Sequence, residues 1–277
     1  TAPQVRCNLN APFASTVSAA VSAIKAALTS PDIPFNDGAM RPITVSAPEG
    51  TLLNPRHPAP VRARMEACSR AWNAVMKALA QAVPDRVIAC GFDTTTSFCL
   101  SRLQPQGWSV YLEVYGGGFG ATAGGDGCDA VDNPLSNCSN TPVEAMDQDF
   151  SFFRVIEYAL RPDSAGPGRH RGGVGFLRRF EILEDGTKLA LYSDRFRSAP
   201  EGLFGGGAGA TGWCEVLRDG RRISLRSKDQ MDLRRGDIVT IALGGGGGYG
   251  DPAERDPTAV ARDVEDGLIS VPPGGAA

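Results

Sequence analysis

Three clusters of glycine constrain this chain more than any other feature. They are GGGFGATAGGDG at Gly116–Gly127, GRHRGGVG at Gly168–Gly175 and GGGGGYGDP at Gly244–Pro252. Glycine loses more conformational freedom on folding than any other residue, so clusters persist where φ is positive or where another backbone or a ligand approaches closely. The clusters therefore predict tight backbone sites.

The clusters do not match the phosphate-binding loops of nucleotide sites. A Walker loop needs a Gly-Lys step followed by Ser or Thr, and the sequence contains none. The G-x-G-x-x-G spacing at 207–212 leads into a strand-like run instead of a helix. The same spacing at 245–250 follows a strand, but no second parallel strand comes after it. We expect tight packing, turns or the wall of another ligand's channel, and no nucleotide.

Charge and cysteine usage exclude several classes of partner. A net charge of -3 and a pI of about 5.5 give no basic surface for nucleic acid or an anionic membrane. No apolar stretch reaches the roughly 20 residues that a membrane-spanning helix needs. The seven cysteines are odd in number and lack a C-x-x-C pair, which favours reduced thiols over a disulfide framework or a zinc site. We expect a cytoplasmic protein.

The periodicity of apolar residues predicts an α+β fold. Helical spacing covers Ser15–Leu28 and Val61–Ala82, with a short helix at Pro257–Asp266 and a short strand at Ile43–Ser46. Strand-like runs follow at Val87–Cys90, Ser97–Leu100, Trp108–Tyr115, Phe152–Leu160, Phe176–Leu183, Lys188–Arg197, Trp213–Leu217 and Asp237–Leu243. The dipeptides at 185–186 and 219–220 are Asp-Gly, which is typical of antiparallel hairpins. We expect an α/β region over 1–105 and a β-rich, glycine-loop region over 106–277.

Candidate site residues are few because the sequence has two histidines. His57 lies among prolines and is interpreted as structural, whereas His170 lies between two arginines that would favour its neutral form. Asp126 and Arg171 each sit inside a glycine frame that lets a ligand approach. Both could instead form structural ion pairs, which we favour for two acidic groups and four arginines: Asp126, Asp129, Asp132; Glu144, Asp147, Asp149; Arg169, Arg171, Arg178, Arg179.

Longer phrases make the chain resemble the hydantoinase B family, which includes the matching part of oxoprolinase. These phrases are IPFNDGAMRPITVSAPEGTLLNPRHPAPV, TPVEAMDQD, YALRPDSAGPGRHRGGVGFLRRFEIL, APEGLFGGGAG and RRGDIVTIALGGGGGYGDPAERDPTAVARDVEDGLIS, in that order along nearly the whole chain. Members of the family carry a long upstream region, so the chain resembles the C-terminal half of such a protein. Thr1 could be an N-terminal nucleophile, but its surroundings resemble an internal family segment.

The resemblance implies an ATP-dependent enzyme that hydrolyses a cyclic amide such as a hydantoin, oxoproline or lactam. It implies that ATP and magnesium bind a partner A subunit, and that a divalent metal, zinc or manganese, belongs to the upstream half. It assigns no metal or cofactor to this chain. Partners would be the A subunit, the upstream half and a small-molecule substrate in a hetero-oligomer. Two alternatives stay open: a component of a ketone carboxylase of acetone or acetophenone type, and a noncatalytic assembly module.

Overall fold

The computed structural model describes residues 1–136, 138–139 and 141–270, which fall into two compact units. The helical unit comprises residues 1–89 and 122–124, and the strand-rich unit comprises 90–121 and the described residues from 125 onward. The boundary expected at residue 105 would separate β1 (Thr96–Gln104) from β2 (Gly107–Tyr115), which pair along their whole length. The structure divides after Ala89 instead.

The helical unit contains α1 (Phe13–Leu28), α2 (Asp37–Met40), α3 (Met65–Leu79) and the 3-10 turn η1 (Pro84–Arg86). Both long predicted helices are confirmed, and α3 is shorter at each end than its pattern. In α1, alanines 19, 23 and 27 form a buried stripe, because residues four apart lie on one face of a helix. Helix α3 packs against α1 and buries Trp72 and Met76. The predicted strand at 43–46 has no regular structure.

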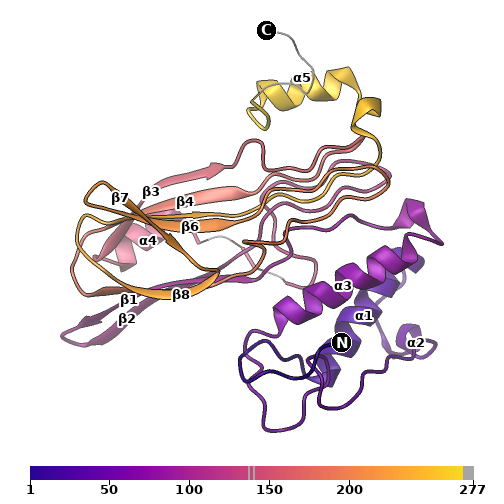
Figure 1. The fold of residues 1–277 in the computed structure, drawn as a ribbon, viewed down its shortest axis with the longest axis horizontal. Helices are drawn as coiled ribbons and strands as arrows, with labels where there is room; N and C mark the ends of the chain where they lie inside the picture. Colours follow the sequence, from indigo (N-terminus) through magenta and orange to yellow (C-terminus); the bar gives the residue numbers. More distant parts are fainter. Residues whose placement is uncertain (137, 140, 271–277) are drawn as a thin grey trace. The chain divides into compact units, whose positions relative to one another are not determined.

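The strand-rich unit contains two antiparallel sheets, seen facing each other in Figure 1. The first has the strand order β2-β1-β5-β8 and the second β3-β4-β9-β6-β7. The remaining strands are β3 (Phe153–Leu160), β4 (Phe176–Ile182), β5 (Thr187–Tyr192), β6 (Trp213–Arg218), β7 (Arg221–Leu225), β8 (Lys228–Leu233) and β9 (Ile238–Ala242). The α+β class is confirmed.

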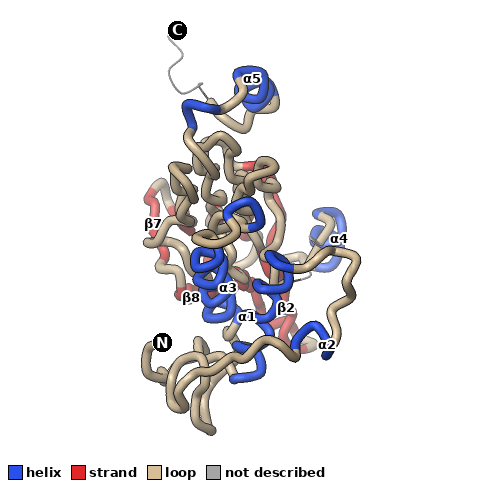
Figure 2. Tube along the Cα trace, turned by 90° about the vertical axis from the view of Figure 1, so that its right-hand side faces the viewer, coloured by secondary structure: helices blue, strands red, loops and turns tan. Residues whose placement is uncertain are grey.

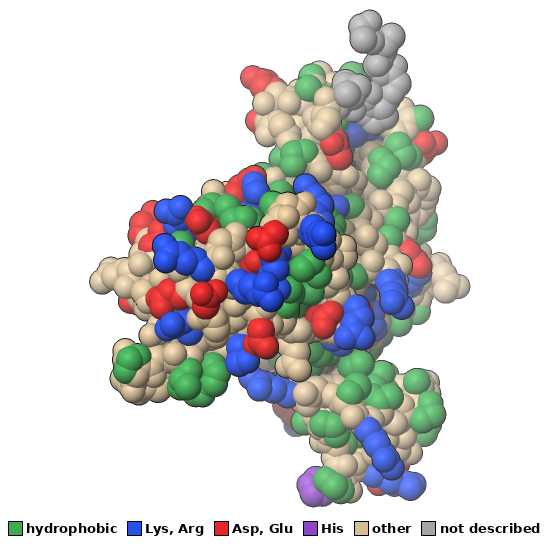
Figure 3. Space-filling model, turned by 60° about the vertical axis from the view of Figure 1, so that its left-hand side comes forward, with side chains coloured by type: hydrophobic (Ala, Val, Ile, Leu, Met, Phe, Trp, Pro, Cys, Tyr) green, Lys and Arg blue, Asp and Glu red, His purple; other side chains and the backbone are tan. Residues whose placement is uncertain are grey.

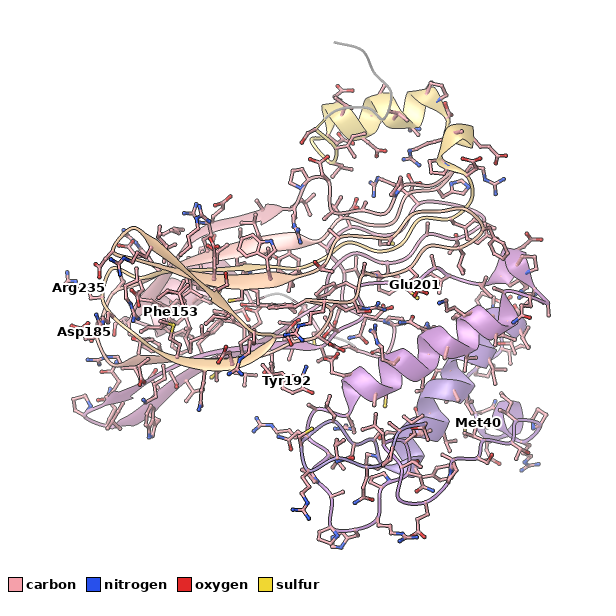
Figure 4. The ribbon with its side chains drawn as sticks, in the orientation of Figure 1. Met40, Phe153, Asp185, Tyr192, Glu201 and Arg235 are labelled. Carbon is pink, nitrogen blue, oxygen red and sulfur yellow. The ribbon has the colours of Figure 1, made fainter. Side chains whose placement is uncertain are left out.

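The core of this unit lies between the two sheets. Alternating residues of each strand point inward, and the rings of Phe98 and Phe180 stack across the interface with centroids 4.8 Å apart. Phe153, labelled in Figure 4, belongs to the same aromatic cluster and contacts Tyr111 at 5.0 Å between centroids. Such a two-layer sandwich explains why the strands read as alternating buried and exposed residues.

The two Asp-Gly turns have different outcomes. Asp219 and Gly220 have φ of 50° and 74° and close the β6–β7 hairpin, as predicted. The prediction of a hairpin at Asp185 is wrong, because β4 and β5 belong to different sheets and the turn carries the chain from one layer to the other. Figure 4 shows Asp185 beside Arg235 at the far end of the sandwich, and its carboxylate accepts a hydrogen bond from the Arg235 backbone at 2.9 Å.

The glycine clusters form a bundle of extended segments next to the sandwich, drawn as parallel traces in Figure 1 and as loops in Figure 2. We define the glycine bundle as residues 116–121, 164–175, 200–210 and 244–250. The segment 244–250 hydrogen-bonds to the other three segments. Its backbone hydrogen bonds recur every third residue. The carbonyls of Gly244 and Gly247 accept from the N–H groups of residues 118 and 121, and the N–H groups of residues 246 and 249 donate to the carbonyls of residues 173 and 170. A three-residue repeat without internal bonds is typical of a polyproline II-like helix.

Close packing explains most of the glycines in the clusters. A Cβ built on Gly246 would lie 1.9 Å from the Phe119 carbonyl oxygen, and one on Gly173 would lie 1.9 Å from the Cys128 carbonyl oxygen. Within the three clusters, Gly250 is the one glycine with a positive φ, at 74°. Close approach of backbones, one of the two reasons expected for these glycines, therefore accounts for them better than turn geometry.

Two further helices flank the strand-rich unit's segments. The predicted C-terminal helix is confirmed as α5 (Pro257–Glu265), which begins with an Asp256 side-chain cap on the Thr258 N–H at 2.9 Å. It is preceded by the 3-10 turn η2 (Pro252–Glu254). The segment after Pro142 was not predicted to be helical and forms α4 (Val143–Asp149).

The surface in Figure 3 shows Lys and Arg side chains interspersed with Asp and Glu over the strand-rich unit. This view shows no gathering of one sign of charge, in agreement with the small net charge. Among the described helices, none combines the length and apolar character needed to cross a membrane. All seven cysteines are free thiols, as predicted.

Candidate functional site

The three candidate residues from the sequence lie together in the strand-rich unit. Asp126 follows the first glycine segment, and His170 and Arg171 belong to the second segment of the glycine bundle. Arg255 and Asp263, from the region of α5, join them. We call Asp126, Asp129, Arg171, Arg255 and Asp263 the ion-pair cluster.

Asp126 is held by donors from two parts of the chain. Its Oδ1 accepts the backbone N–H of Arg171 at 2.8 Å, and both its oxygens accept from the Arg255 guanidinium at 2.8 and 2.9 Å. Burial raises the pKa of Asp126, but the hydrogen bonds and charge of Arg255 and the Arg171 backbone outweigh it, so the pKa lies below its ordinary value of 3.8. The carboxylate is therefore ionised at neutral pH.

Arg171 is nearly buried and uses its guanidinium fully within the cluster. It donates to Asp129 through both terminal nitrogens, at 2.8 and 3.1 Å, and to Asp263 through Nε at 2.9 Å. Burial lowers the pKa of Arg171, but the hydrogen bonds of Asp129 and Asp263 outweigh it and raise the pKa above its usual value. A bidentate pair of this kind fixes geometry as well as charge.

Arg255 closes the cluster by donating to Asp263 at 2.6 Å. Three carboxylates thus alternate with two guanidiniums and connect α5 to the glycine bundle. The prediction of structural ion pairing is confirmed for Asp129 with Arg171, whereas Asp126 pairs with Arg255, which was not among the arginines expected. Arg255 was not predicted from the sequence. Its position just after the last glycine cluster is the feature that could have indicated it.

The other charged residues pair elsewhere. Arg169 lies 4.0 Å from Glu254, and Arg179 pairs with Glu157 at 3.0 Å on the strand surface. Helix α4 carries the carboxylates of residues 144, 147 and 149. In the part of the chain that the structure describes, none of them forms an ion pair with the four arginines. The acidic group at 144–149 therefore does not pair as the sequence suggested.

His170 has the least constrained side chain of the three candidates. Its backbone exchanges hydrogen bonds with Tyr249 at 3.0 and 2.9 Å, whereas its imidazole is 28% exposed and makes no hydrogen bond with the described residues. Nδ1 lies 3.8 Å from Asp126 Oδ1. The Arg171 guanidinium points to Asp129 and Asp263, so the carboxylate of Asp126 is the charged group that lies beside the imidazole.

A second polar network lies inside the sandwich; Arg178 was expected to form an ion pair, but with other carboxylates than Glu113. Arg178 of β4 is fully buried and donates to Glu113 of β2 at 2.6 Å, while its guanidinium carbon lies 4.0 and 5.0 Å from the ring centroids of Tyr158 and Tyr115. Tyr111 donates to Glu113 and contacts the Tyr115 hydroxyl at 2.8 Å. The spacing Tyr111, Glu113, Tyr115 places all three on one strand face, which was the available signal.

This buried network is interpreted as structural. Burial lowers the pKa of Arg178, but its electrostatic interactions with Tyr115 and Glu113 outweigh this effect and raise the pKa above its usual value. Burial is also the main reason that the pKa of Tyr111 is raised. Two Arg178 nitrogens find no hydrogen-bond partner among the described residues, and the aromatic rings on the guanidinium partly replace one. The network ties the two sheets together.

No group of three or more His, Cys, Asp and Glu side chains within the described residues is placed to hold a metal ion. The carboxylates of the ion-pair cluster face guanidiniums, which would repel a cation. Chemically, the cluster can fix α5 and orient the loop at Asp126, and His170 is the group beside it that has an accessible polar side chain.

Comparisons with known proteins agree with the resemblance in the sequence. The family model described as hydantoinase B/oxoprolinase matches residues 1–252. An uncharacterized protein of Methanocaldococcus jannaschii is 39% identical over 97% of this chain and 46% of its own length. The B subunit of a putative D-/L-hydantoinase from a Pseudomonas species is 35% identical over 98% of this chain and 47% of its own length. The chain spans about half the length of these curated relatives.

Solved structures share the fold. The ATP-dependent caprolactamase from Pseudomonas jessenii superimposes with a TM-score of 0.83 and 24% identity, over 98% of this chain and 49% of that one. Nucleotide-free acetone carboxylase superimposes with a TM-score of 0.81 and 20% identity, over 95% and 40%. At this level of identity the likeness concerns the fold alone. The match of the family model over most of the chain shows that this protein belongs to the hydantoinase B/oxoprolinase family.

Proposed function

We propose that the chain is part of the B-type component of an ATP-dependent enzyme that hydrolyses a cyclic amide together with an ATP-binding A subunit. The observation that carries this proposal is family membership over residues 1–252. Three kinds of named relative support a cyclic amide as the substrate class: a hydantoinase component, 5-oxoprolinases and a caprolactamase component. The first and the last are named as single subunits, which also supports an assembly of several polypeptides.

The chemistry of such a reaction explains its need for ATP. An unstrained amide resists attack by water, because resonance lowers the reactivity of its carbonyl carbon. Phosphoryl transfer from ATP to the amide oxygen would weaken that resonance and create a leaving group. Water then adds to the activated carbonyl carbon and the ring C–N bond breaks, which leaves an acyl phosphate and the free amine. A second water hydrolyses the acyl phosphate and releases phosphate. The balanced reaction consumes ATP, the cyclic amide and two waters, and it yields ADP, phosphate and the ring-opened acid.

Within this scheme the chain supplies a rigid scaffold and an imidazole beside the ion-pair cluster. The glycine bundle has little room for movement, because its segments touch through backbone atoms. Asp126 and Arg171 act as positioning residues, since both are occupied in the ion-pair cluster. His170, with its partly exposed imidazole beside Asp126, is the residue that we assign to contact with substrate or with the catalytic partner.

Two alternatives have less support. A ketone carboxylase component is suggested by acetone carboxylase, but that likeness of 20% identity concerns the fold. A noncatalytic assembly module is suggested by the described residues, which offer no metal-binding group. Both make different predictions for a reconstituted complex.

The test is reconstitution of this chain with the remaining polypeptides of its complex and measurement of ADP and ring-opened product. Hydantoin, 5-oxoproline and caprolactam are screened, with acetone plus bicarbonate as the comparison. We expect turnover of a cyclic amide that disappears when this chain is omitted. Bicarbonate-dependent carboxylation would favour the carboxylase, and full hydrolysis without this chain would favour the assembly module.

The role of His170 has its own control in the sequence, which contains one other histidine. We expect His170→Gln to lower kcat by about tenfold or more, and His57→Gln to leave it unchanged. An unchanged kcat in a correctly folded His170→Gln complex would remove His170 from the site without affecting the proposed reaction.

A further inference from the structure

The outer face of strand β2 exposes a continuous apolar stripe. Trp108, Val110 and Leu112 alternate along the strand on the face away from the core, and their exposed fractions are 56%, 50% and 49%. Leu103 of β1 lies directly opposite Trp108 and is 60% exposed. Contiguous exposed apolar residues of this size on a strand are typical of an interaction surface.

Strand β2 also has an open edge. It is the terminal strand of its sheet, and within the described residues β1 is the one strand that pairs with it. No described residue outside β1 hydrogen-bonds to the backbone of β2, so the N–H and C=O groups along its other edge can pair with a further strand. An apolar face next to an open edge favours association through strand addition.

The other edge strands carry charges that discourage pairing, whereas β2 does not. Strand β3 has Arg154 and Glu157, β7 begins with two arginines, and β8 includes Lys228, Asp229 and Asp232. The single charged residue of β2 is Glu113, which points into the core and pairs with Arg178. Charged side chains on edge strands commonly protect against association. Because the exposed side of β2 lacks them, this edge is the one best suited to pair with another strand.

We propose that β2 pairs antiparallel with β2 of a second copy of this chain. The two-fold axis would pass through Val110, and the two four-stranded sheets would join into one continuous sheet. This inference concerns self-association and does not depend on the proposed enzymatic function.

The pattern of side chains favours a second copy as the occupant. In an antiparallel pair centred on Val110, Trp108 of one copy faces Leu112 of the other, and Val110 faces its own equivalent. All these residues lie on one face, so each stripe is complementary to itself without any charge across the junction. The outer edges of the joined sheet would be the two β8 strands, whose charges stop further growth.

The experiment is sedimentation equilibrium of the full chain over about 1–100 µM, a range in which mass action reports a micromolar dimer. Two lysine variants are compared: Val110→Lys at the proposed axis, and Ile156→Lys on edge strand β3, where the residue is also apolar and 42% exposed. We expect a dimer whose Kd rises about tenfold in Val110→Lys, because two lysines would lie directly opposite each other across the strand pair and repel. The Kd of Ile156→Lys should match that of the wild type.

Amide hydrogen exchange of residues 107–115 in the wild type gives a reading that does not depend on a variant folding. Protection there should increase between dilute and concentrated samples. A wild-type chain that is monomeric at about 100 µM would overturn the proposal. A dimer unaffected by Val110→Lys, exchange at 107–115 that is independent of concentration, or a different protein protecting this strand at equal stoichiometry would also overturn it.

Discussion

Gly246 lies where three backbone segments meet. Its N–H donates to Gly173, its carbonyl accepts from Gly166, and a Cβ at this position would lie 1.9 Å from the carbonyl oxygen of Phe119. Because backbone atoms cannot move aside as a flexible side chain can, we expect Gly246→Ala to lower the free energy of unfolding by about 3 kcal/mol or more. Urea denaturation measures it. Gly125→Ala is the matched control, because its Cβ meets nothing within 4 Å; we expect a change of no more than about 1 kcal/mol. Equal stabilities would contradict the packing argument.

These two glycines also show what the sequence can predict at this scale. The clusters indicated close approach of backbones, but the sequence does not distinguish Gly246 from Gly125. The difference in space around the two residues depends on the path of the neighbouring segments. The same limit applies to the site. Asp126, His170 and Arg171 were identified from their glycine frame, and ion pairing was expected, but Arg255 and Asp263 were not selected. They reach Asp126 and Arg171 through contacts 129 and 92 residues apart in sequence.

Helix α5 is attached to the glycine bundle through the ion-pair cluster, so its attachment should depend on pH. The pKa of Asp126 lies below 3.8 in the folded protein, so its contribution is complete above that value and is lost as the pH falls through the folded pKa. We expect NMR titration of the Asp126 carboxyl to give a pKa below 3.8 in the wild type and a higher one in Arg255→Gln, together with faster amide exchange across α5. Arg262→Gln, on α5 but outside the cluster, should leave the Asp126 pKa unchanged. An Asp126 pKa that is the same in both variants would show that Arg255 does not hold the carboxylate.

Helices and strands were predicted correctly where the local pattern of apolar residues determines the structure, and incorrectly where contacts with distant segments determine it. Helices α1, α3 and α5 and most strands follow their apolar periodicity. Strands β7 and β8 were missed as ranges because polar residues fill them, as edge strands allow. The Asp-Gly turn at 219–220 makes a hairpin while the one at 185–186 joins two sheets, since turn chemistry fixes the reversal but not the strand that is hydrogen-bonded next.

At the scale of the whole molecule, the strand-rich unit depends on a segment close to its C-terminal end. Residues 244–250 hydrogen-bond to the other three segments of the glycine bundle and also to Cys90, so contacts separated by more than a hundred residues must form together. A chain that stops after Leu243 keeps every strand of both sheets but loses these bonds. We expect it to lack the near-ultraviolet circular dichroism of the packed aromatic core and to aggregate. As the control, a chain that stops after Ser270 keeps all the described residues and should match the full chain in both measurements. If the shorter truncation shows the native spectrum and a cooperative thermal transition, the sandwich folds without the bundle, and the glycine clusters serve a purpose other than holding this unit together.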